Sequence, residues 1–330
     1  MNLKGKRILF FTASFMGFQF DIKKCLDAQG AKVEWFDERM SDKTLNKIIV
    51  RLDRDALSRK ISKYYNDILN NVRTNHYDYV LFVNIEAATR SILMHYKEAF
   101  PDAKFILYEW DSIRNQKNAK ENLDLFDIVW TFDRNDSKEY GIRFLPLFYL
   151  DKYARLEKRN NYKNKILFVG TTHSDRYRFI KTIEKQVCKN NEKSFLWFYF
   201  PSKLLYYKMW FSDRAFRSSS RMSDFRFSVL NEDELLKEVE QSEIIVDAQH
   251  PKQTGLTMRT IEALGSCRKL ITTNADIENY DFYNPHNILL VDRINPVVTD
   301  DFLNSRYEDV PEEIYRKYSL TSWVKTIFGS

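Results

Sequence analysis

The sequence predicts an α/β protein made of two similar domains, each built on an open parallel sheet. The chain has 330 residues, and a usual size of roughly 150 residues per domain suggests two domains. Short apolar runs alternate with helical patterns along the chain, which is the rhythm of βαβ units. A charged stretch with few apolar residues, 151–164, separates two halves that each begin with strand, loop and helix.

The first half, residues 1–150, is expected to form one domain. Its expected strands are 7–12, 32–37, 78–84, 104–110, 127–133 and 143–148, and its expected helices are 21–31, about 41–75, 88–100 and 117–124. The basic residues Lys4, Lys6 and Arg7 precede the apolar run of the first expected strand, and this pattern also resembles a secretory signal peptide. We favour a buried strand because an amphipathic helical pattern resumes at Asp21.

The second half, residues 151–310, repeats the alternation. Its expected strands are 165–170, 195–200, 243–249, 269–274 and 287–292, with helices after the first strand, near 232–241 and from 257 to 265. A last helix at about 311–327, within the terminal segment 311–330, is a candidate to pack back on the first domain.

Composition narrows the class of protein. The three cysteines, Cys25, Cys188 and Cys267, are far apart and show no CxxC or Cys/His spacing, which favours a reducing cytoplasm and no structural zinc. Beyond the first strand, no run approaches the ~20 apolar residues of a membrane-spanning helix. The positive net charge of +6 is concentrated in one segment, because residues 151–221 contain 17 Lys/Arg and only 6 Asp/Glu.

The segment 249–274, QHPKQTGLTMRTIEALGSCRKLITTN, follows an expected strand, and ligands of open α/β sheets bind beyond the carboxyl ends of strands. Gly255 permits close backbone approach, and Thr257 can cap a helix of about eight residues that Gly265 ends. Free amides and the dipole at such a helix N-terminus suit a pyrophosphate. His250 could contact the sugar or a phosphate, or could be a loop residue fixed by packing.

Arg259 and Glu262 lie on one face of this expected helix, away from the packed face of Thr257, Ile261 and Leu264. A carboxylate at Glu262 could accept both hydroxyl protons of a ribose. The alternative is an ordinary packing helix on which Arg259 and Glu262 form a solvated pair.

A second loop, VGTTHSDR, follows the first strand of the second half. It offers Gly170, Thr171, Thr172 and Arg176 to phosphate oxygens at another helix N-terminus. Loops of this composition are common, so the hypothesis depends on the two loops acting together.

The segment QTGLTMRTIEALGSCRKLITTN, with FILYEWDS and LFVGTTHSDR at their relative positions, resembles glycosyltransferases of the GT-B fold, especially those of bacterial surface-polysaccharide assembly (lipopolysaccharide, capsule and exopolysaccharide). The resemblance covers most of the chain in order, but its specific part is 247–274. It implies two facing Rossmann-like open-sheet domains, with the nucleotide sugar bound chiefly by the second and the acceptor by the first.

The resemblance also implies residue roles. Gly255, Leu256 and Thr257 would give amides to the diphosphate, Arg259 would help to neutralise it, and Glu262 would hold the ribose. Thr171, Thr172 and Arg176 would approach the phosphates from the facing loop. Retaining members commonly carry two glutamates eight positions apart, and this chain has Thr254 at the earlier position, which favours an inverting mechanism.

An inverting transferase needs a general base for the acceptor hydroxyl. Asp111, Glu109 and Glu86 follow strands of the first domain, and Asp111 is preferred because it lies just past its apolar strand. The alternative is that Asp111 caps a helix or forms a salt bridge. Gly17 and Glu86 are candidates for the acceptor loops. Because no DxD pair stands in a strand-end loop, we expect no metal and no other cofactor.

Residues 195–217 mix aromatic and basic side chains that suit the headgroup region of an anionic membrane. The candidate contacts are Trp197, Lys203, Tyr206, Tyr207, Lys208, Trp210 and Arg214. The alternative is a buried strand, FLWFYF, followed by a packed helix. No nucleic-acid-binding motif is present, so no nucleic-acid partner is expected.

The leading hypothesis is a cytoplasmic glycosyltransferase, peripheral on the inner face of the plasma membrane, that moves a sugar from a nucleotide-diphosphate donor to a growing, lipid-linked surface glycan. One alternative is a nucleotide-sugar epimerase of the same fold, which needs no acceptor. Another is a non-catalytic binding protein of the same fold.

Overall fold

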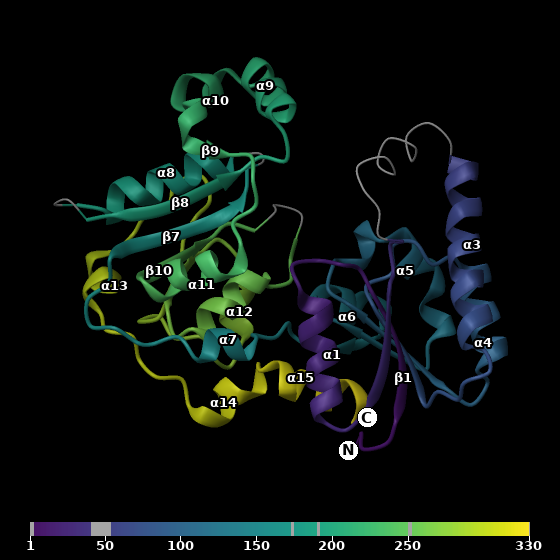
Figure 1. Cartoon of the computed structure of the whole chain (residues 1–330). Helices are drawn as coiled ribbons and strands as arrows, with labels where there is room; N and C mark the ends of the chain where they lie inside the picture. The colour runs from purple at the N-terminus through teal and green to yellow at the C-terminus, as the bar shows by residue number, and fades with distance from the viewer. Residues whose placement is uncertain (1–2, 41–53, 173–174, 190–191, 250–252, 330) are drawn as a thin grey trace. The chain divides into compact units, whose positions relative to one another are not determined.

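The computed structural model describes residues 3–40, 54–172, 175–189, 192–249 and 253–329 (Figure 1). The chain forms two compact units. Unit 1 comprises Met1–Leu147 with Leu320–Ser330, and unit 2 comprises Phe148–Ser319. Each unit has its own sheet and its own core.

Unit 1 contains a six-stranded, fully parallel sheet in the order β2-β1-β3-β4-β5-β6. The strands are β1 (Arg7–Thr12), β2 (Lys32–Asp37), β3 (Tyr79–Val83), β4 (Lys104–Glu109), β5 (Ile128–Thr131) and β6 (Arg143–Phe144). All five residues of β3 are buried, as expected for a central strand that is covered on both faces.

The helices of unit 1 cover this sheet. They are α1 (Phe18–Ala28), α3 (Arg54–Val72), α4 (Arg90–Ala99), α5 (Lys117–Asn122), α6 (Arg134–Tyr140) and α15 (Leu320–Phe328), with short 3₁₀ turns at Ile113–Asn115 and Leu123–Leu125. The C-terminal helix α15 belongs to this core because the Trp323 ring packs edge-on to Tyr108 at 4.8 Å, and Phe328 packs edge-on to Tyr79 at 4.9 Å.

Unit 2 contains a second six-stranded parallel sheet, in the order β12-β11-β10-β7-β8-β9. Its strands are β7 (Asn164–Thr171), β8 (Ser194–Tyr199), β9 (Phe225–Arg226), β10 (Ser242–Asp247), β11 (Lys269–Thr272) and β12 (Ile288–Leu290). Its helices are α7 (Asp151–Ala154), α8 (Arg176–Val187), α9 (Lys203–Ser212), α10 (Arg214–Ser219), α11 (Glu232–Glu240), α12 (Met258–Gly265), α13 (Asp300–Asn304) and α14 (Glu312–Lys317), with 3₁₀ turns at Met222–Asp224 and Ala275–Asn279.

Strand order locates the edge where each sheet can bind a ligand. In unit 2 the chain runs outward from β7 in one direction and from β10 in the other, so the order reverses between these neighbouring strands. In unit 1 the reversal lies between β1 and β3. Ligands of doubly wound sheets bind at the carboxyl ends of the strands at such a reversal.

Most of the predicted elements are confirmed, and the differences lie at their ends. The strand predicted at 143–148 is only two residues long, and α6 and α7 were not predicted. The helix predicted at 311–327 is two helices, because the chain leaves α14 at Tyr318 and Ser319 pairs with Tyr149 before α15 starts. Part of the predicted helix 41–75 lies outside the described residues. No helix among the described residues is both long and apolar enough to cross a bilayer.

Candidate functional site

The N-terminus of α12 is fixed to the end of β10 by a shared carboxylate. Thr257 is the N-cap, and its Oγ1 accepts a hydrogen bond of 3.2 Å from the Thr260 amide. The same hydroxyl donates to Asp247 Oδ2 at 2.7 Å, and Thr260 Oγ1 donates to that oxygen at 3.0 Å. The predicted cap and the predicted helix length are therefore confirmed, with Asp247 as an added anchor.

The loop before α12 is held from the neighbouring strand end. Asn274, just past β11, donates through Nδ2 to the carbonyl oxygens of Thr254 at 3.1 Å and Gly255 at 3.2 Å. Gly255 and Leu256 are buried. Backbone amides at this helix N-terminus are thus held in place before any ligand arrives. His250 lies outside the described residues.

Gly265 is the last residue of α12, as predicted, but it does not end the helix as a left-handed cap. The left-handed residue after the helix is Cys267, with φ of 52°, and not Gly265. A Cβ on Gly265 would lie 2.5 Å from Cβ of Tyr149. Glycine is needed here because another part of unit 2 packs directly against the helix backbone.

Arg259 and Glu262 form an enclosed ion pair. Arg259 Nη1 lies 2.6 Å from Glu262 Oε2, and the two side chains are only 14% and 8% exposed. Burial raises the pKa of Glu262, and Arg259 offsets part of that effect. Burial lowers the pKa of Arg259, but Glu262, Tyr153 and Asp247 together outweigh that effect, and the pKa of Arg259 is raised. The pair is therefore not the solvated pair of the alternative interpretation.

The β7–α8 loop contributes the second half of the site. Arg176 Nη1 donates to the Thr171 carbonyl at 2.9 Å. A Cβ on Gly170 would lie only 3.0 Å from the Phe168 ring, so glycine relieves a close approach to that ring, whereas Arg176 Nη1 at 3.6 Å would be at ordinary contact distance. Burial lowers the pKa of Arg176, and the charge of Asp247 opposes that shift. The Asp247 carboxylate therefore acts on both loops.

Three of the predicted donor-binding side chains keep an unsatisfied polar atom. Within the described residues, Thr172 Oγ1, Arg176 Nε and Arg259 Nη1 are buried and have no hydrogen-bond partner of acceptable geometry. Buried polar atoms are nearly always satisfied in folded proteins, and exceptions call for a role or a missing ligand. All three lie on or beside the two loops that follow β7 and β10.

Sequence reasoning missed three residues of this edge. Asp247 ends β10, and the strand-end rule that selected the loops would have selected it too. Arg293, past β12, forms a bidentate pair with Asp175 at 2.8 and 2.9 Å and donates to the Gln249 carbonyl at 2.7 Å. Asn274 gave no local signal, because its partners are backbone carbonyls distant in sequence.

In unit 1, Asp111 is the predicted base with an exposed carboxylate. Its Oδ2 accepts weak hydrogen bonds from Gln116 Nε2 at 3.3 Å and Asn84 Nδ2 at 3.4 Å. Asn84 follows β3 with φ of 66° and also donates to Glu86 Oε1 at 3.2 Å. Partial desolvation raises the pKa of Asp111, against these two hydrogen bonds. Asp111 and Glu86 therefore share one amide donor.

Glu109, the other predicted base, is fully buried, and its Oε1 accepts from the Ile85 amide at 3.0 Å. Burial raises the pKa of Glu109 well above its usual range. A general base must come within about 3 Å of the proton that it removes, so this carboxyl group supports the loop after β3 instead. Gly17, with φ of 82°, precedes α1 in the loop after β1, at the reversal of sheet order.

A buried carboxyl group that the sequence did not reveal supports the same loop. Glu38 is completely buried, and its Oε1 accepts from the amides of Glu86, Ala87 and Ala88 at 3.0, 2.8 and 3.0 Å. Desolvation raises the pKa of Glu38 to about 7. Nothing in the local sequence pattern distinguishes Glu38 from the other acidic residues around it.

The predicted membrane segment divides between core and surface. Tyr206 is 3% exposed and belongs to the aromatic core of unit 2, which corrects its prediction as a membrane contact. Trp197 and Trp210 are half-buried, and Arg226 lies 5.5 Å from the Trp197 ring centroid. Tyr207 is exposed, as are the three remaining predicted contacts, Lys203, Lys208 and Arg214. Arg217, on α10, is exposed as well.

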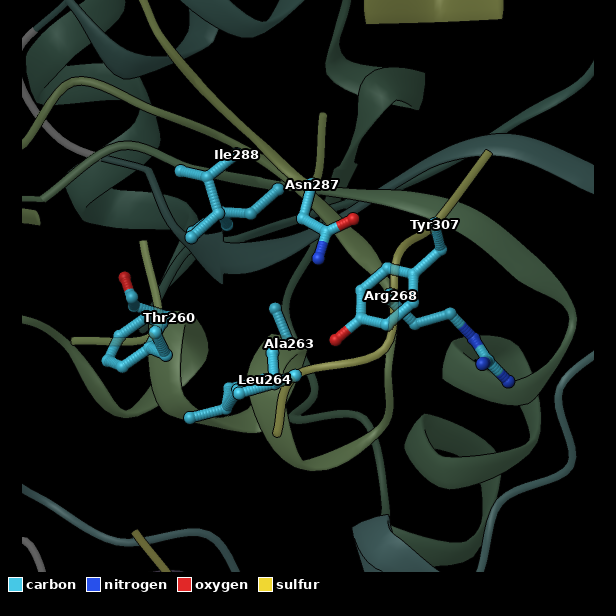
Figure 2. Close-up of a pocket in the computed structure, with 10 residues that line it drawn as sticks. Thr260, Ala263, Leu264, Arg268, Asn287, Ile288 and Tyr307 are labelled. Carbon is cyan, nitrogen blue, oxygen red and sulfur yellow. The ribbon is translucent and has the colours of Figure 1, made fainter. Parts of the chain in front are cut away.

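Two cavities of unit 2 do not mark the donor site. A cavity of about 10 Å³ lies beside α12, with Ala263, Leu264, Asn287 and Ile288 in its wall (Figure 2). That volume holds about one water molecule, whereas ligand pockets measure hundreds of Å³. A hollow of about 580 Å³ includes Glu243 and Lys269, near the amino ends of β10 and β11. The described residues contain no group of three or more His, Cys, Asp or Glu side chains placed to hold a metal.

The sequence matches no protein-family model and no curated protein. Solved structures do resemble it. The UDP-GlcNAc 2-epimerase of Methanocaldococcus jannaschii, in complex with UDP-GlcNAc and UDP, has a TM-score of 0.54 at 11% identity, covering 98% of this chain and 100% of that chain. Sucrose-phosphate synthase of Thermosynechococcus elongatus has a TM-score of 0.56 at 12% identity, covering 98% and 92%.

The catalytic domain of starch synthase IV of Arabidopsis thaliana, bound to ADP and acarbose, has a TM-score of 0.55 at 8% identity, covering 99% of this chain and 98% of that chain. At such low identity these likenesses show the fold alone. The chain has two six-stranded parallel sheets with alternating helices, the GT-B architecture that the sequence predicted.

Proposed function

We propose that this chain is a glycosyltransferase that moves a sugar from a nucleotide-diphosphate donor to an acceptor hydroxyl. One observation carries the proposal. The unsatisfied buried atoms of Thr172 and Arg176 lie in the loop after β7 and at the start of α8, beside the reversal of the unit 2 sheet. A diphosphate offers the acceptor oxygens that these donors lack.

The donor is assigned to unit 2. The first amides of α12 and the positive end of its dipole would bind the diphosphate, and Arg176 would add a full charge from the other loop. Glu262 would accept the ribose hydroxyls, with Arg259 keeping its carboxylate ionised in an enclosed position. These are the roles that the resemblance implied for the same residues.

The proposed reaction is inverting. The acceptor oxygen attacks the anomeric carbon, the bond from that carbon to the diphosphate breaks, and the nucleoside diphosphate leaves with the bonding electron pair. Asp111 of unit 1 would take the hydroxyl proton as general base. Growing negative charge on the leaving group would be stabilised by the α12 N-terminus and Arg176, so we propose that no metal is needed.

The proposed acceptor is a growing surface glycan carried on a lipid. The support is the resemblance of 247–274 to enzymes of surface-polysaccharide assembly, together with the exposed basic and aromatic side chains of unit 2. The likenesses to a sucrose-phosphate synthase and a starch synthase support sugar transfer as a class and leave the acceptor open.

A thermal-shift screen with UDP-, GDP-, CMP- and dTDP-sugars would identify the donor, because a ligand of the native state raises its melting temperature. Calorimetry would then test the site. Thr172→Val removes one hydroxyl at nearly constant volume, and we expect donor affinity to fall about tenfold, as for loss of a hydrogen bond to a charged group. Thr182→Val, an exposed threonine on α8, is the matched control. Equal donor affinity in the two variants would remove the site from unit 2.

A nucleotide-sugar epimerase is the second candidate, favoured by the likeness to an archaeal UDP-GlcNAc 2-epimerase. It would convert the donor without an acceptor. Incubating the protein with the donor alone and following the sugar by NMR separates the two reactions. A new sugar epimer supports the epimerase. Donor binding with neither epimerisation nor slow hydrolysis supports a non-catalytic binding protein.

A further inference from the structure

Helix α9 is more apolar than its position in unit 2 explains. Seven of its ten residues are apolar or aromatic, yet Tyr206 is the only buried one. A helix with apolar residues on all sides is normally enclosed by protein or by lipid. In Figure 1, α9 and α10 stand beyond the sheet of unit 2, on the side of its edge strand β9.

One face of α9 carries an exposed apolar row. Leu204, Tyr207 and Phe211 are spaced at i, i+3 and i+7, so they lie on one side of the helix, and they are 78%, 45% and 70% exposed. We call these three residues the outer row. Tyr206 points into the core and packs edge-on to Phe200 at 5.6 Å. The helix is therefore anchored on one side, and its outer row faces away from its own unit.

Positive charge surrounds the outer row. Residues 201–221 contain five Lys/Arg and one acidic residue, Asp213. The Asp213 carboxylate accepts from the Phe216 amide at 2.9 Å and serves as the N-cap of α10. In the described part of the chain, no carboxylate lies within 4.0 Å of the charged nitrogens of Lys208, Arg214 or Arg217. These cations are available to an anionic partner.

We propose that the α9–α10 pair, residues 203–219, docks unit 2 on an anionic lipid bilayer. The outer row would enter the boundary between headgroups and acyl chains, and the surrounding Lys and Arg would meet lipid phosphates. Only the biological reason for docking rests on the proposed function, because a lipid-linked acceptor lies at a membrane surface.

The side chains favour a bilayer over other partners. An RNA surface would use aromatic rings for stacking and polar groups for base edges, and Leu204, the most exposed member of the row, provides neither. A second copy would bring two positively charged surfaces together, which electrostatic repulsion opposes. A bilayer takes up leucine and phenylalanine and attracts the cations at once.

Vesicle sedimentation tests the docking without donor or acceptor. The full-length protein is mixed with phosphatidylcholine vesicles and with vesicles that also contain phosphatidylglycerol. We expect sedimentation only with the anionic vesicles, weaker at high salt because exposed charges are screened. Leu204→Ser/Phe211→Ser should reduce binding about tenfold or more, since binding scales with the apolar area inserted. Ile294→Ser/Val297→Ser, at two equally exposed positions of unit 2, should bind like wild type.

Three results would overturn the proposal: equal recovery in the supernatant with both vesicle types, equal loss of binding in the two double variants, and a dimer in solution that dissociates on Leu204→Ser/Phe211→Ser. Capture of RNA that abolishes vesicle binding would replace the lipid with a nucleic acid. Turnover of a water-soluble acceptor is measured on the same variants. Normal turnover by a wild-type protein that does not bind vesicles would remove the docking surface and leave the proposed function intact.

Discussion

Arg259 Nη1 and Glu262 Oε2 lie 2.6 Å apart on α12, in a position where solvent reaches little of either side chain. On an exposed helix such an i,i+3 pair contributes a few tenths of a kcal/mol. Enclosed, the attraction is stronger, but both charges lose hydration, and the balance is often close to zero. Stability alone therefore gives weak reason to keep this pair, whereas binding a ribose gives a reason to keep Glu262 ionised.

Glu262→Gln tests the pair. It leaves the Arg259 charge enclosed without its partner, and we expect a loss of about 3–5 kcal/mol of unfolding free energy, the usual cost of breaking a buried pair. Arg259→Met/Glu262→Gln removes both charges and should regain most of that loss. Urea denaturation measures both variants. Equal losses in the single and double variants would mean that the two charges are not coupled.

The same double variant separates folding from binding. If Glu262 holds the ribose, the folded Arg259→Met/Glu262→Gln protein should bind nucleotide at least about tenfold more weakly than wild type, as for a lost hydrogen bond to a charged group. Calorimetry with the best ligand of the thermal-shift screen measures this. Wild-type affinity in a folded double variant would assign the pair to structure alone.

The Thr257 hydroxyl has two hydrogen-bond partners. Two substitutions can separate the effect of losing these bonds from the effect of changing the side-chain volume. Thr257→Ser keeps the cap to the Thr260 amide and the bond to Asp247, and should behave like wild type. Thr257→Val loses both, and we expect a cost of about 1–2 kcal/mol. Donor affinity should fall with it, since the first amides of α12 lose their anchor. Thermal unfolding and calorimetry on the two variants provide the measurement.

The sign of the stability change caused by Gly265→Ala tests the close contact with Tyr149. In a helix, alanine is ordinarily more stable than glycine by about 0.5–1 kcal/mol. Here the new Cβ would lie 2.5 Å from the Tyr149 Cβ, and overpacking of this kind costs about 1–3 kcal/mol. We expect a lower melting temperature. A higher one would mean that the contact with Tyr149 yields easily.

Local pattern predicted the strand-end loops and α12, because short apolar runs, a capping threonine and a helical period are all encoded within a few residues. It could not show that Glu109 is enclosed, since its partner Ile85 lies in the loop after the neighbouring strand, β3. Tyr206 and Tyr207 look alike in sequence, yet one helical step places the first in the core and leaves the second exposed. The break before α15 depends on the pairing of Ser319 with Tyr149, 170 positions earlier in the chain.

Asp111→Asn tests the proposed base at nearly constant shape. Loss of general base catalysis typically lowers kcat by ~10²–10⁴-fold, and we expect that loss with donor affinity unchanged. Glu86→Gln changes the neighbouring carboxyl group, which shares the Asn84 amide, and should keep most of the activity. Steady-state kinetics decide between them. A larger loss in Glu86→Gln would move the base to Glu86.

The Glu38 carboxyl group should make unit 1 less stable as pH rises. Its folded pKa of about 7 lies above the ordinary value of 4.5, so the folded state holds the proton more tightly than the unfolded state. The resulting stabilisation is complete below pH 4.5 and is lost as pH rises through 7. A shift of this size corresponds to about 3 kcal/mol.

Glu38→Gln isolates this effect from other titrating groups. Its side-chain oxygen can still accept from the amides of Glu86, Ala87 and Ala88, but it does not ionise. Wild type minus variant stability should therefore fall by about 3 kcal/mol between pH 4.5 and pH 8. Urea unfolding at a series of pH values gives the difference, and hydrogen exchange at Ala87 and Ala88 reports on the loop itself. A difference that is constant with pH would place the Glu38 pKa at its ordinary value, and the loop after β3 would then be held by an ionised carboxylate throughout.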